Sequence, residues 1–279
     1  MRGRGIRFRD AGTLACHNAA MTQPEEQVLA GGNVADVVVR VGGTVRKPAG
    51  AQTGDVEAFL SYLNDNGFAG APRTLGRDER GRHVIEYIPG QLAYEKPPMD
   101  LPGLRRVGRL IREFHDISAG FVPRRDAQWD MAIPPDRSDL ICHHDPASWN
   151  LVCDGDRWVF IDWDGAGPGS RLWDLAWAAT SFVPLESGGD PAVDAPRLRA
   201  LADGYGLTAE QRREFPPLIG AHSRGMFDLL RESAETGRQP WARLYAEGHG
   251  DYWGPAADYA DQHIDAWSRA LGQRAATAD

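Results

Sequence analysis

Two short polar segments on either side of an expected β-hairpin constrain the fold of this chain most strongly. Residues 143–150 are HHDPASWN and residues 160–164 are FIDWD. Between them, two apolar runs are joined by Asp154-Gly155, and such a pair is among the stronger hairpin signals in a sequence. Hairpin strands are antiparallel, so residues at the open end lie close together. We therefore expect Asn150 and Asp162, which flank this hairpin, to be neighbours.

The side chains of these segments are suited to the chemistry of phosphate. Asn150 and Asp162 offer an amide oxygen and a carboxylate, the hard ligands that Mg²⁺ accepts while it keeps waters and nucleotide oxygens. Asp145 is a candidate to accept or orient the proton of an attacking hydroxyl. Each residue also has a purely structural interpretation. Asp145 would cap a turn, Asn150 would be a turn residue, and Asp162 would end a strand. Their joint placement favours a site for moving a γ-phosphoryl group to a hydroxyl.

The chain resembles the aminoglycoside phosphotransferase and choline kinase family, small-molecule kinases with a fold related to that of protein kinases. The resemblance rests on H-x-D-x-x-x-x-N at 143–150, on Ile161-Asp162-Trp163-Asp164 and on Trp173-Asp174-Leu175-Ala176, and it covers roughly residues 25–270. It implies ATP and Mg²⁺ as cofactors. It also implies roles for five residues: Asp145 as the catalytic Asp, Asn150 and Asp162 as metal ligands, His143 as a support of the loop, and Asp174 as a helix-start residue that braces the site.

The resemblance implies an α+β, protein-kinase-like fold with two lobes, and the order of the expected elements agrees with it. A hairpin over residues 37–47, a helix over 55–66 and strands near 71–76 and 83–88 predict a small β-rich N-terminal lobe. A larger, mainly helical C-terminal lobe follows, with helices expected near residues 102–115, 194–204, 215–236 and 256–271. We place the nucleotide-binding lobe at 21–92 and the catalytic and acceptor-binding lobe at 93–279. Residues 1–20 are interpreted as a disordered arm or a misassigned start, because Met21 opens a run that resembles a natural beginning.

The nucleotide residues of the N-terminal lobe follow from the resemblance. Lys47, at the end of a strand, fits the ammonium that contacts the α- and β-phosphates, and Glu57 in the next helix could pair with it. Arg46 is the substitute, because one residue of register decides which side chain faces inward. Alternatively, Lys47 is a solvated strand-end residue and Glu57 a favourable charge at a helix start. Glu86 and Ile88 lie where backbone groups between the lobes would bind the adenine edge.

The sequence departs from the family pattern at two places. Neither G-x-G-x-x-G nor G-x-x-x-x-G-K-[ST] occurs in the expected N-terminal hairpin, so phosphate contacts would depend on Gly31-Gly32-Asn33, Lys47 and the metal. His144 stands where the family usually has Gly. It is either a bystander that faces solvent or a residue that shapes the acceptor pocket.

Composition limits the classes of function and partner. No run approaches the roughly 18 to 20 apolar residues that span a bilayer, and no apolar run follows the N-terminal arginines as in a signal peptide, so we expect a cytoplasmic protein. A net charge of −8 disfavours a nucleic-acid partner. From Gly165 onward there are 16 Asp and Glu against 11 Arg and no Lys. This balance favours a cationic alcohol as acceptor, although it is equally typical of a solvated acidic surface.

Three hypotheses follow. The first is an ATP-dependent O-phosphotransferase that acts on a hydroxyl of a small molecule, either a cationic one such as an aminoglycoside or an amino alcohol, or a sugar. The second is a catalytically weak nucleotide-binding or immunity-type module on the same fold, suggested by the atypical N-terminal lobe and His144. The third is an unrelated hydrolase in which His144 and Asp145 activate water, but the chain lacks the G-x-S-x-G motif of a nucleophile elbow.

Overall fold

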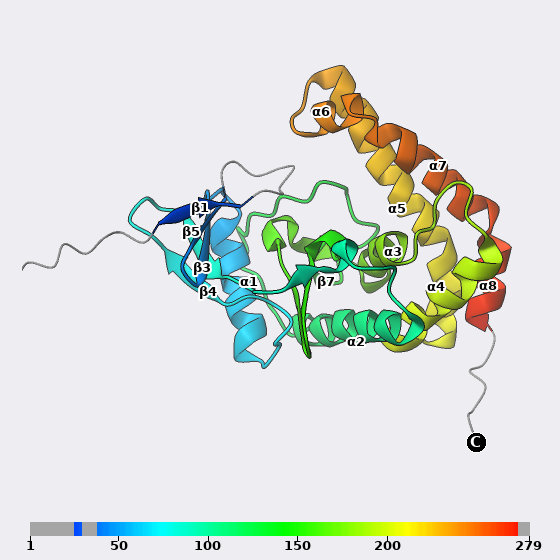
Figure 1. Cartoon of the computed structure of the whole chain (residues 1–279), viewed down its shortest axis with the longest axis horizontal. Helices are drawn as coiled ribbons and strands as arrows, with labels where there is room; N and C mark the ends of the chain where they lie inside the picture. The colour runs from blue at the N-terminus through cyan, green and yellow to red at the C-terminus, as the bar shows by residue number, and fades with distance from the viewer. Residues whose placement is uncertain (1–24, 30–37, 273–279) are drawn as a thin grey trace, which may run out of the picture.

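The computed structural model describes residues 25–29 and 38–272, and it has a small antiparallel sheet beside a larger helical part (Figure 1). The expected α+β, protein-kinase-like fold class is confirmed. The expectations for residues 1–20 and for Gly31-Gly32-Asn33 lie outside the described residues. The division into lobes at residue 92 stays a prediction. None of the helices in the described ranges combines the length and the apolar character needed to cross a membrane.

The N-terminal part contains a five-stranded sheet with the strand order β1-β2-β3-β5-β4 and antiparallel neighbours throughout. The expected hairpin is confirmed, since β2 and β3 pair Val39 with Arg46 and Val41 with Thr44. Gly42 in its turn has a φ of +59°, a conformation that residues with a Cβ rarely adopt. The strands are β1 (Glu26–Val28), β2 (Val39–Val41), β3 (Thr44–Lys47), β4 (Thr74–Arg77) and β5 (His83–Glu86).

Helix α1 (Thr53–Asp65) follows β3 and lies beside the sheet (Figure 1), where the sequence pattern predicted a helix over residues 55–66. Its side chains at helical spacing, Val56, Phe59, Leu60 and Leu63, are all buried. Burial of such a stripe is the main reason why a helix of this length is stable in a protein.

The predicted hairpin next to the polar motifs is also confirmed. β8 (Leu151–Asp154) and β9 (Arg157–Phe160) pair in antiparallel fashion, with Leu151 opposite Phe160 at the open end. Gly155 in the turn has a φ of +51°, which explains the Asp-Gly signal. A short strand, β6 (Gln91–Leu92), extends this sheet along β8.

A second small sheet places the motif that precedes the hairpin. β7 (Leu140–Cys142) is buried along its whole length and pairs with β10 (Gly167–Gly169). Short 3₁₀ turns lie next to these strands: η1 (Ala93–Glu95) follows β6, η2 (Ser148–Asn150) lies between β7 and β8, and η3 (Trp163–Gly165) lies between β9 and β10. The polar segments therefore emerge from buried strands, which hold them in place.

The helical part begins with α2 (Leu101–Ser118). Asp100 caps the N-terminus of this helix, since its carboxylate accepts from the Gly103 N–H at 2.8 Å. The helix covers the predicted segment 102–115. The helices that follow are α3 (Arg171–Phe182), α4 (Pro191–Tyr205), α5 (Ala209–Thr236), α6 (Trp241–Ala246), α7 (His249–Gln262) and α8 (Ile264–Gly272).

Two predicted helix boundaries were wrong. Helix α5 begins at Ala209 rather than near 215, because Thr208 and Gln211 form a capping box and fix the start six residues earlier. The helix expected over 256–271 is interrupted at His263, where α7 ends. The carbonyl of His263 accepts from the N–H of Ala266 and of Trp267, which starts α8 as a separate helix.

Trp163 joins the helical and hairpin parts of the core. Its indole is 1% exposed, and its Nε1 donates to the carbonyl of Phe160 at 2.7 Å. Its ring packs edge-on against Phe59 of α1, at 5.9 Å between centroids, and against Phe114 of α2, at 5.4 Å. The residues on either side of Trp163 are Asp162 and Asp164, so the core fixes the position of both carboxylates.

Candidate active site

A buried carboxylate organises the loop that follows β7. Asp174, in the first turn of α3, is 1% exposed and accepts the backbone N–H of His143 at 3.1 Å and that of His144 at 2.8 Å. It also accepts from His115 Nε2 at 3.1 Å. Burial by itself would raise the pKa of Asp174, but the hydrogen bond with His115 lowers it to about 2, while burial lowers the pKa of His115 itself. Asp174 is therefore a fixed negative charge beneath the loop.

The loop turns sharply at His144, which has a φ of +65°. This left-handed conformation costs little for Gly and more for residues with a Cβ, so the loop keeps His144 in a conformation that its side chain disfavours. The His144 ring does not point freely into solvent, because Nε2 lies 3.0 Å from the Pro168 carbonyl and 3.2 Å from that of Gly167. These contacts hold the side chain against β10.

His143 connects the loop to the end of the β8–β9 hairpin. Its Nδ1 accepts from the Asp145 N–H at 3.2 Å, and its Nε2 lies 3.1 Å from the carbonyl of Ile161. Burial lowers the pKa of His143, so the ring is neutral at pH 7. A neutral ring with the proton on Nε2 satisfies both contacts, since Nδ1 then accepts and Nε2 donates. The side chain thus ties Asp145 to the residue before Asp162.

Asp145 lies at the end of this loop and is held by three side-chain donors. Trp177 Nε1 donates to Oδ1 at 2.5 Å, while Trp149 Nε1 and Asn150 Nδ2 donate to Oδ2 at 3.2 Å and 2.8 Å. Burial raises the pKa of Asp145 to about 7, against the opposing effect of these hydrogen bonds. The charge of nearby Asp162 contributes to this raised pKa.

Asn150 and Asp162 occupy the open end of the hairpin, as expected. The Ile161 N–H donates to the Asn150 carbonyl at 2.8 Å, which continues the hairpin pairing to the residue before Asp162. Asp162 has a φ of +62°, and its side chain is 56% exposed. Since Asn150 Nδ2 is directed to Asp145, its Oδ1 is the atom suited to bind a cation. An amide oxygen and an accessible carboxylate are hard donors that fit Mg²⁺.

Lys47 reaches this group from β3. Its ammonium lies 2.7 Å from Asp164 Oδ2 and 3.6 Å from Asp162 Oδ1, and the residue is 6% exposed. Burial would lower the pKa of Lys47, but the two carboxylates raise it above its ordinary value, so it is charged. Arg46 instead approaches Asp78 at 3.5 Å. The register of the strand therefore directs Lys47, and not Arg46, to Asp162.

The expected pair between Glu57 and Lys47 was wrong. Glu57 forms an ion pair with Arg77 of β4 at 3.2 Å and lies 4.0 Å from His83 Nε2. The Lys47 ammonium instead forms ion pairs with Asp162 and Asp164, the carboxylates that follow the hairpin. A role for Glu57 toward the nucleotide stays a prediction.

The side chains of Glu86 and Ile88 are used within the protein. The Glu86 carboxylate contacts Arg157 at 3.0 Å and Arg73 at 3.3 Å. Ile88 is 6% exposed and packs against Val152 and Val159. A ligand at this position would have to use backbone groups, and the assignment of the adenine site to this segment stays a prediction.

The sequence argument missed the two indoles that bind Asp145, because residue type alone does not distinguish a tryptophan that only packs in the core from one that also donates to a carboxylate. Trp177 is indeed 3% exposed and belongs to a buried cluster of α3, α5 and α7. One signal was available: Asp174 and Trp177 are three residues apart and so share a face of α3. Because the resemblance implies that Asp174 braces the loop, the same spacing could have placed Trp177 near that loop.

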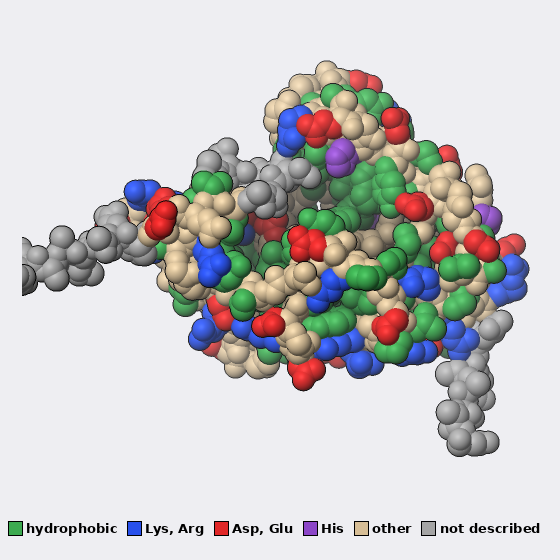
Figure 2. Space-filling model, in the orientation of Figure 1, with side chains coloured by type: hydrophobic (Ala, Val, Ile, Leu, Met, Phe, Trp, Pro, Cys, Tyr) green, Lys and Arg blue, Asp and Glu red, His purple; other side chains and the backbone are tan. Residues whose placement is uncertain are grey.

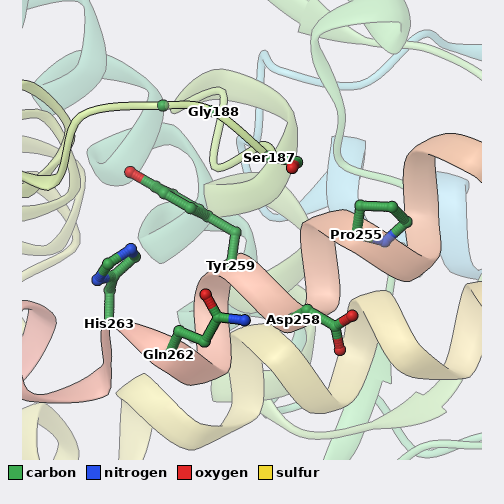
Figure 3. Close-up of a pocket in the computed structure, with 8 residues that line it drawn as sticks. Ser187, Gly188, Pro255, Asp258, Tyr259, Gln262 and His263 are labelled. Atoms are coloured by element: carbon green, nitrogen blue, oxygen red, sulfur yellow. The ribbon is translucent and has the colours of Figure 1, made fainter.

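The surface of the molecule is hollowed in two places. Figure 2 shows the molecule hollowed beneath α6 and α7, with hydrophobic side chains on the wall of the hollow. The hollow in Figure 3, about 360 Å³ in volume, lies between α7 and the loop after α3, where Tyr259 projects toward Gly188. None of the predicted site residues lines it. Its lining is Ser187, Gly188, Gly189, Pro255, Asp258, Tyr259, Gln262 and His263.

Comparison with known proteins shows which family and fold the chain resembles. Residues 122–215, which contain both polar motifs, match the model of the family described as "Phosphotransferase enzyme family". The trifolitoxin immunity protein of Rhizobium leguminosarum bv. trifolii is 32% identical over 205 residues, which cover 68% of this chain and 78% of that protein. The chain belongs to the phosphotransferase enzyme family.

Solved structures of kinases share the fold of this phosphotransferase family member. A choline/ethanolamine kinase family protein from Mesorhizobium loti superposes with a TM-score of 0.62 at 16% identity, over 91% of this chain and 94% of that chain. Amicoumacin kinase in complex with AMP-PNP, Ca²⁺ and Ami superposes with a TM-score of 0.61 at 11% identity, over 86% and 88%. At these identities the likeness establishes the fold and no more.

Proposed function

We propose that the protein transfers the γ-phosphoryl group of ATP to a hydroxyl of a small molecule, with Mg²⁺ as the metal. One observation carries the proposal: Asp145, Asn150, Asp162 and Lys47 form a connected group at the open end of one hairpin. Asn150 contacts Asp145 at 2.8 Å, and Lys47 lies 3.6 Å from Asp162. Phosphoryl transfer needs a metal, a cation and a residue that orients the nucleophile in one place.

Asn150 and Asp162 would hold the metal, with Asp164 as a further carboxylate nearby. Bound Mg²⁺ would neutralise phosphate oxygens and help to orient them. The Lys47 ammonium would contact phosphate oxygens as a point charge, which requires no fixed geometry. Before the nucleotide binds, the same ammonium offsets the charges of Asp162 and Asp164.

Asp145 would accept or orient the proton of the attacking hydroxyl. Among the described residues, no Lys or Arg forms an ion pair with its carboxylate, and with a pKa of about 7 the group can take up a proton close to neutral pH. The fixed partners of the loop, Asp174 and His143, would keep the carboxylate in register with the metal ligands. Positioning of this kind supplies most of the rate enhancement when the transition state is loose.

The acceptor is proposed to be a small hydroxylated molecule, with cationic amino alcohols and aminoglycosides as the first candidates. The acidic balance of the chain after Gly165 supports a cationic acceptor. The structural relatives include a choline/ethanolamine kinase family protein and an amicoumacin kinase, which act on small molecules. A cytoplasmic location, as expected from the sequence, fits this proposal.

A second candidate function is an immunity-type module with weak turnover on the same fold. The 32% identical relative is named as an immunity protein, which favours this alternative. Such a protein would bind the nucleotide or the toxic compound without rapid phosphate transfer. The pairing of Lys47 with two carboxylates is compatible with both functions.

The deciding experiment measures transfer of ³²P from [γ-³²P]ATP to a panel of aminoglycosides, amino alcohols and sugars. We expect a labelled product with at least one acceptor, and its formation should require Mg²⁺. For variants that remove a carboxylate of the site, the matched control is Asp265→Asn, which changes an exposed carboxylate on α8. Mg²⁺-dependent nucleotide binding without a labelled product from any acceptor would favour the immunity-type module instead. Absence of nucleotide binding with and without Mg²⁺ would overturn the proposed phosphotransferase.

A further inference from the structure

Two of the three donors on the Asp145 carboxylate are indoles, and they come from different elements. Trp177 of α3 donates to Oδ1 at 2.5 Å, and Trp149 of η2 donates to Oδ2 at 3.2 Å. We propose that Trp177 and Trp149 are positioning residues that set the direction of the Asp145 carboxylate toward the acceptor hydroxyl. The inference rests on the proposed function, because it takes Asp145 to be the residue that orients the nucleophile.

Trp177 is the fixed member of this pair. It is 3% exposed, and its ring stacks on Trp253 at 4.7 Å with an interplanar angle of 22° and on His222 at 4.8 Å with an angle of 30°. An indole confined by two stacked rings cannot rotate without disturbing α5 and α7. Its N–H therefore points in one direction and fixes the position of Oδ1.

Trp149 is the accessible member. It is 36% exposed and meets Trp177 edge-on, with 5.9 Å between centroids and an angle of 81°. An acceptor that reaches the Asp145 carboxylate has to approach next to this exposed ring. Trp149 thus has two effects, one through its N–H on the carboxylate and one through its face on the acceptor.

Neutral donors suit this task better than cations. An arginine or lysine in the same place would form an ion pair and reduce the ability of the carboxylate to attract the proton of the hydroxyl. An indole N–H accepts no proton and releases none in the ordinary pH range, so it orients the carboxylate without competing for the transferred proton. Asn150 adds a third neutral donor, while its oxygen is free to bind the metal.

Trp173 provides a matched control on the same helix. It is 7% exposed and packs on the same His222 ring at 4.5 Å. Within the part of the chain that the structure describes, its Nε1 has no hydrogen-bond partner. A Trp→Phe change therefore removes a hydrogen-bonded N–H at position 177 and an N–H without a hydrogen-bond partner at position 173. The loss of ring size is the same at both positions.

The kinetic test compares Trp177→Phe, Trp149→Phe and Trp173→Phe. For Trp177→Phe we expect kcat to fall about 10- to 100-fold, as for loss of a hydrogen bond to a charged group, with little change in acceptor KM or nucleotide affinity. Trp149→Phe should lower kcat and keep KM, while Trp149→Ala should also raise the acceptor KM. Trp173→Phe should stay within about twofold of the wild type. Equal kcat losses at 173 and 177 would overturn the inference.

Packing changes are separated from the hydrogen bond by a second variant. Benzothienylalanine at position 177 keeps the bicyclic ring and replaces the N–H by sulfur. It should reproduce the kcat loss of Trp177→Phe with a wild-type unfolding temperature. Wild-type kcat in this variant would show that the N–H does not orient Asp145.

An NMR measurement tests the inference without any turnover. Indole N–H resonances are assigned by their loss in the three Trp→Phe variants, and the spectra of the wild type and Asp145→Asn are compared. The Trp177 resonance should move upfield in Asp145→Asn because a neutral amide is a weaker acceptor, whereas that of Trp173 should not move. An unmoved Trp177 resonance would overturn the positioning role. Complete absence of phosphate transfer by the wild type would overturn the proposed function alone.

Discussion

The Lys47 ammonium lies 2.7 Å from the Asp164 carboxylate, so a cation of the sheet and an anion that follows the β8–β9 hairpin are already paired in the described structure. The contact joins the two parts of the molecule at the site. Phosphate oxygens that bind Lys47 have to share it with this carboxylate. The strength of nucleotide binding therefore depends on a competition within the site.

Lys47→Ala is expected to weaken nucleotide binding about tenfold or more, because it removes the phosphate contact and leaves Asp162 and Asp164 without their cation. Isothermal titration with ATP and Mg²⁺ measures the change. Arg46→Ala on the same strand is the control, and it should keep the wild-type affinity because Arg46 contacts Asp78 instead. Equal losses in both variants would contradict the assignment of Lys47.

Asp145→Ala is expected to lower turnover by several orders of magnitude and to leave nucleotide affinity nearly intact. The reason is that the carboxylate would orient the attacking hydroxyl and would not hold the nucleotide in the ground state. Steady-state kinetics together with titration of ATP separate these two effects. Turnover close to that of the wild type would remove Asp145 from the mechanism.

Asp162→Ala is expected to weaken metal–nucleotide binding and turnover together, since an exposed carboxylate beside Lys47 is the proposed metal ligand. The measurement is a Mg²⁺ titration of both nucleotide affinity and rate, which should shift to higher metal concentrations. Asp265→Asn again serves as the control. If the Mg²⁺ dependence of Asp162→Ala matched that of the wild type, the metal would have to bind elsewhere.

Acid is expected to destabilise the fold through His222. Burial lowers its pKa to about 3, so the folded protein keeps the ring neutral where the unfolded chain protonates it. The resulting stability is complete above the unfolded pKa of about 6.5 and is lost as the pH falls toward the folded pKa. One such group contributes a slope of about 1.4 kcal/mol per pH unit below pH 6.5, or about 2 kcal/mol at pH 5.

Denaturant unfolding at pH 7.5 and pH 5 checks this for the wild type and His222→Phe, whose ring can still stack on Trp173 and Trp177. The free energy of unfolding should fall less with acid in the variant, by about 2 kcal/mol. The same difference between the two proteins at both pH values would show that His222 does not contribute to the acid sensitivity.

Much of the fold was predictable because its signals are local. Gly42-Gly43 and Asp154-Gly155 each fix a turn, and the burial pattern of α1 repeats at helical spacing. The grouping of Asn150 with Asp162 was predictable for the same reason, since one hairpin brings them together. Turn residues, and the helical spacing of buried side chains, were sufficient to predict these elements.

The contacts that depend on packing between distant elements were not predictable in this way. Glu57 was paired with Lys47 from its place in the next helix, but Asp164, more than one hundred positions along the chain, lies nearer. The indole of Trp177 reaches Asp145 only because α3 turns one face toward the loop. Sequence spacing gives the face of a helix but not the side chain that this face meets.

Trp163 has a consequence that extends beyond the site. Its indole is anchored among Phe59 and Phe114, while its neighbours in the chain, Asp162 and Asp164, carry the carboxylates that face Lys47. Heat that loosens this ring would release both carboxylates at once. Thermal inactivation and melting of the aromatic interior should accordingly occur in a single transition. A substitution at Trp163 that changes the thermal stability should therefore also change ligand binding.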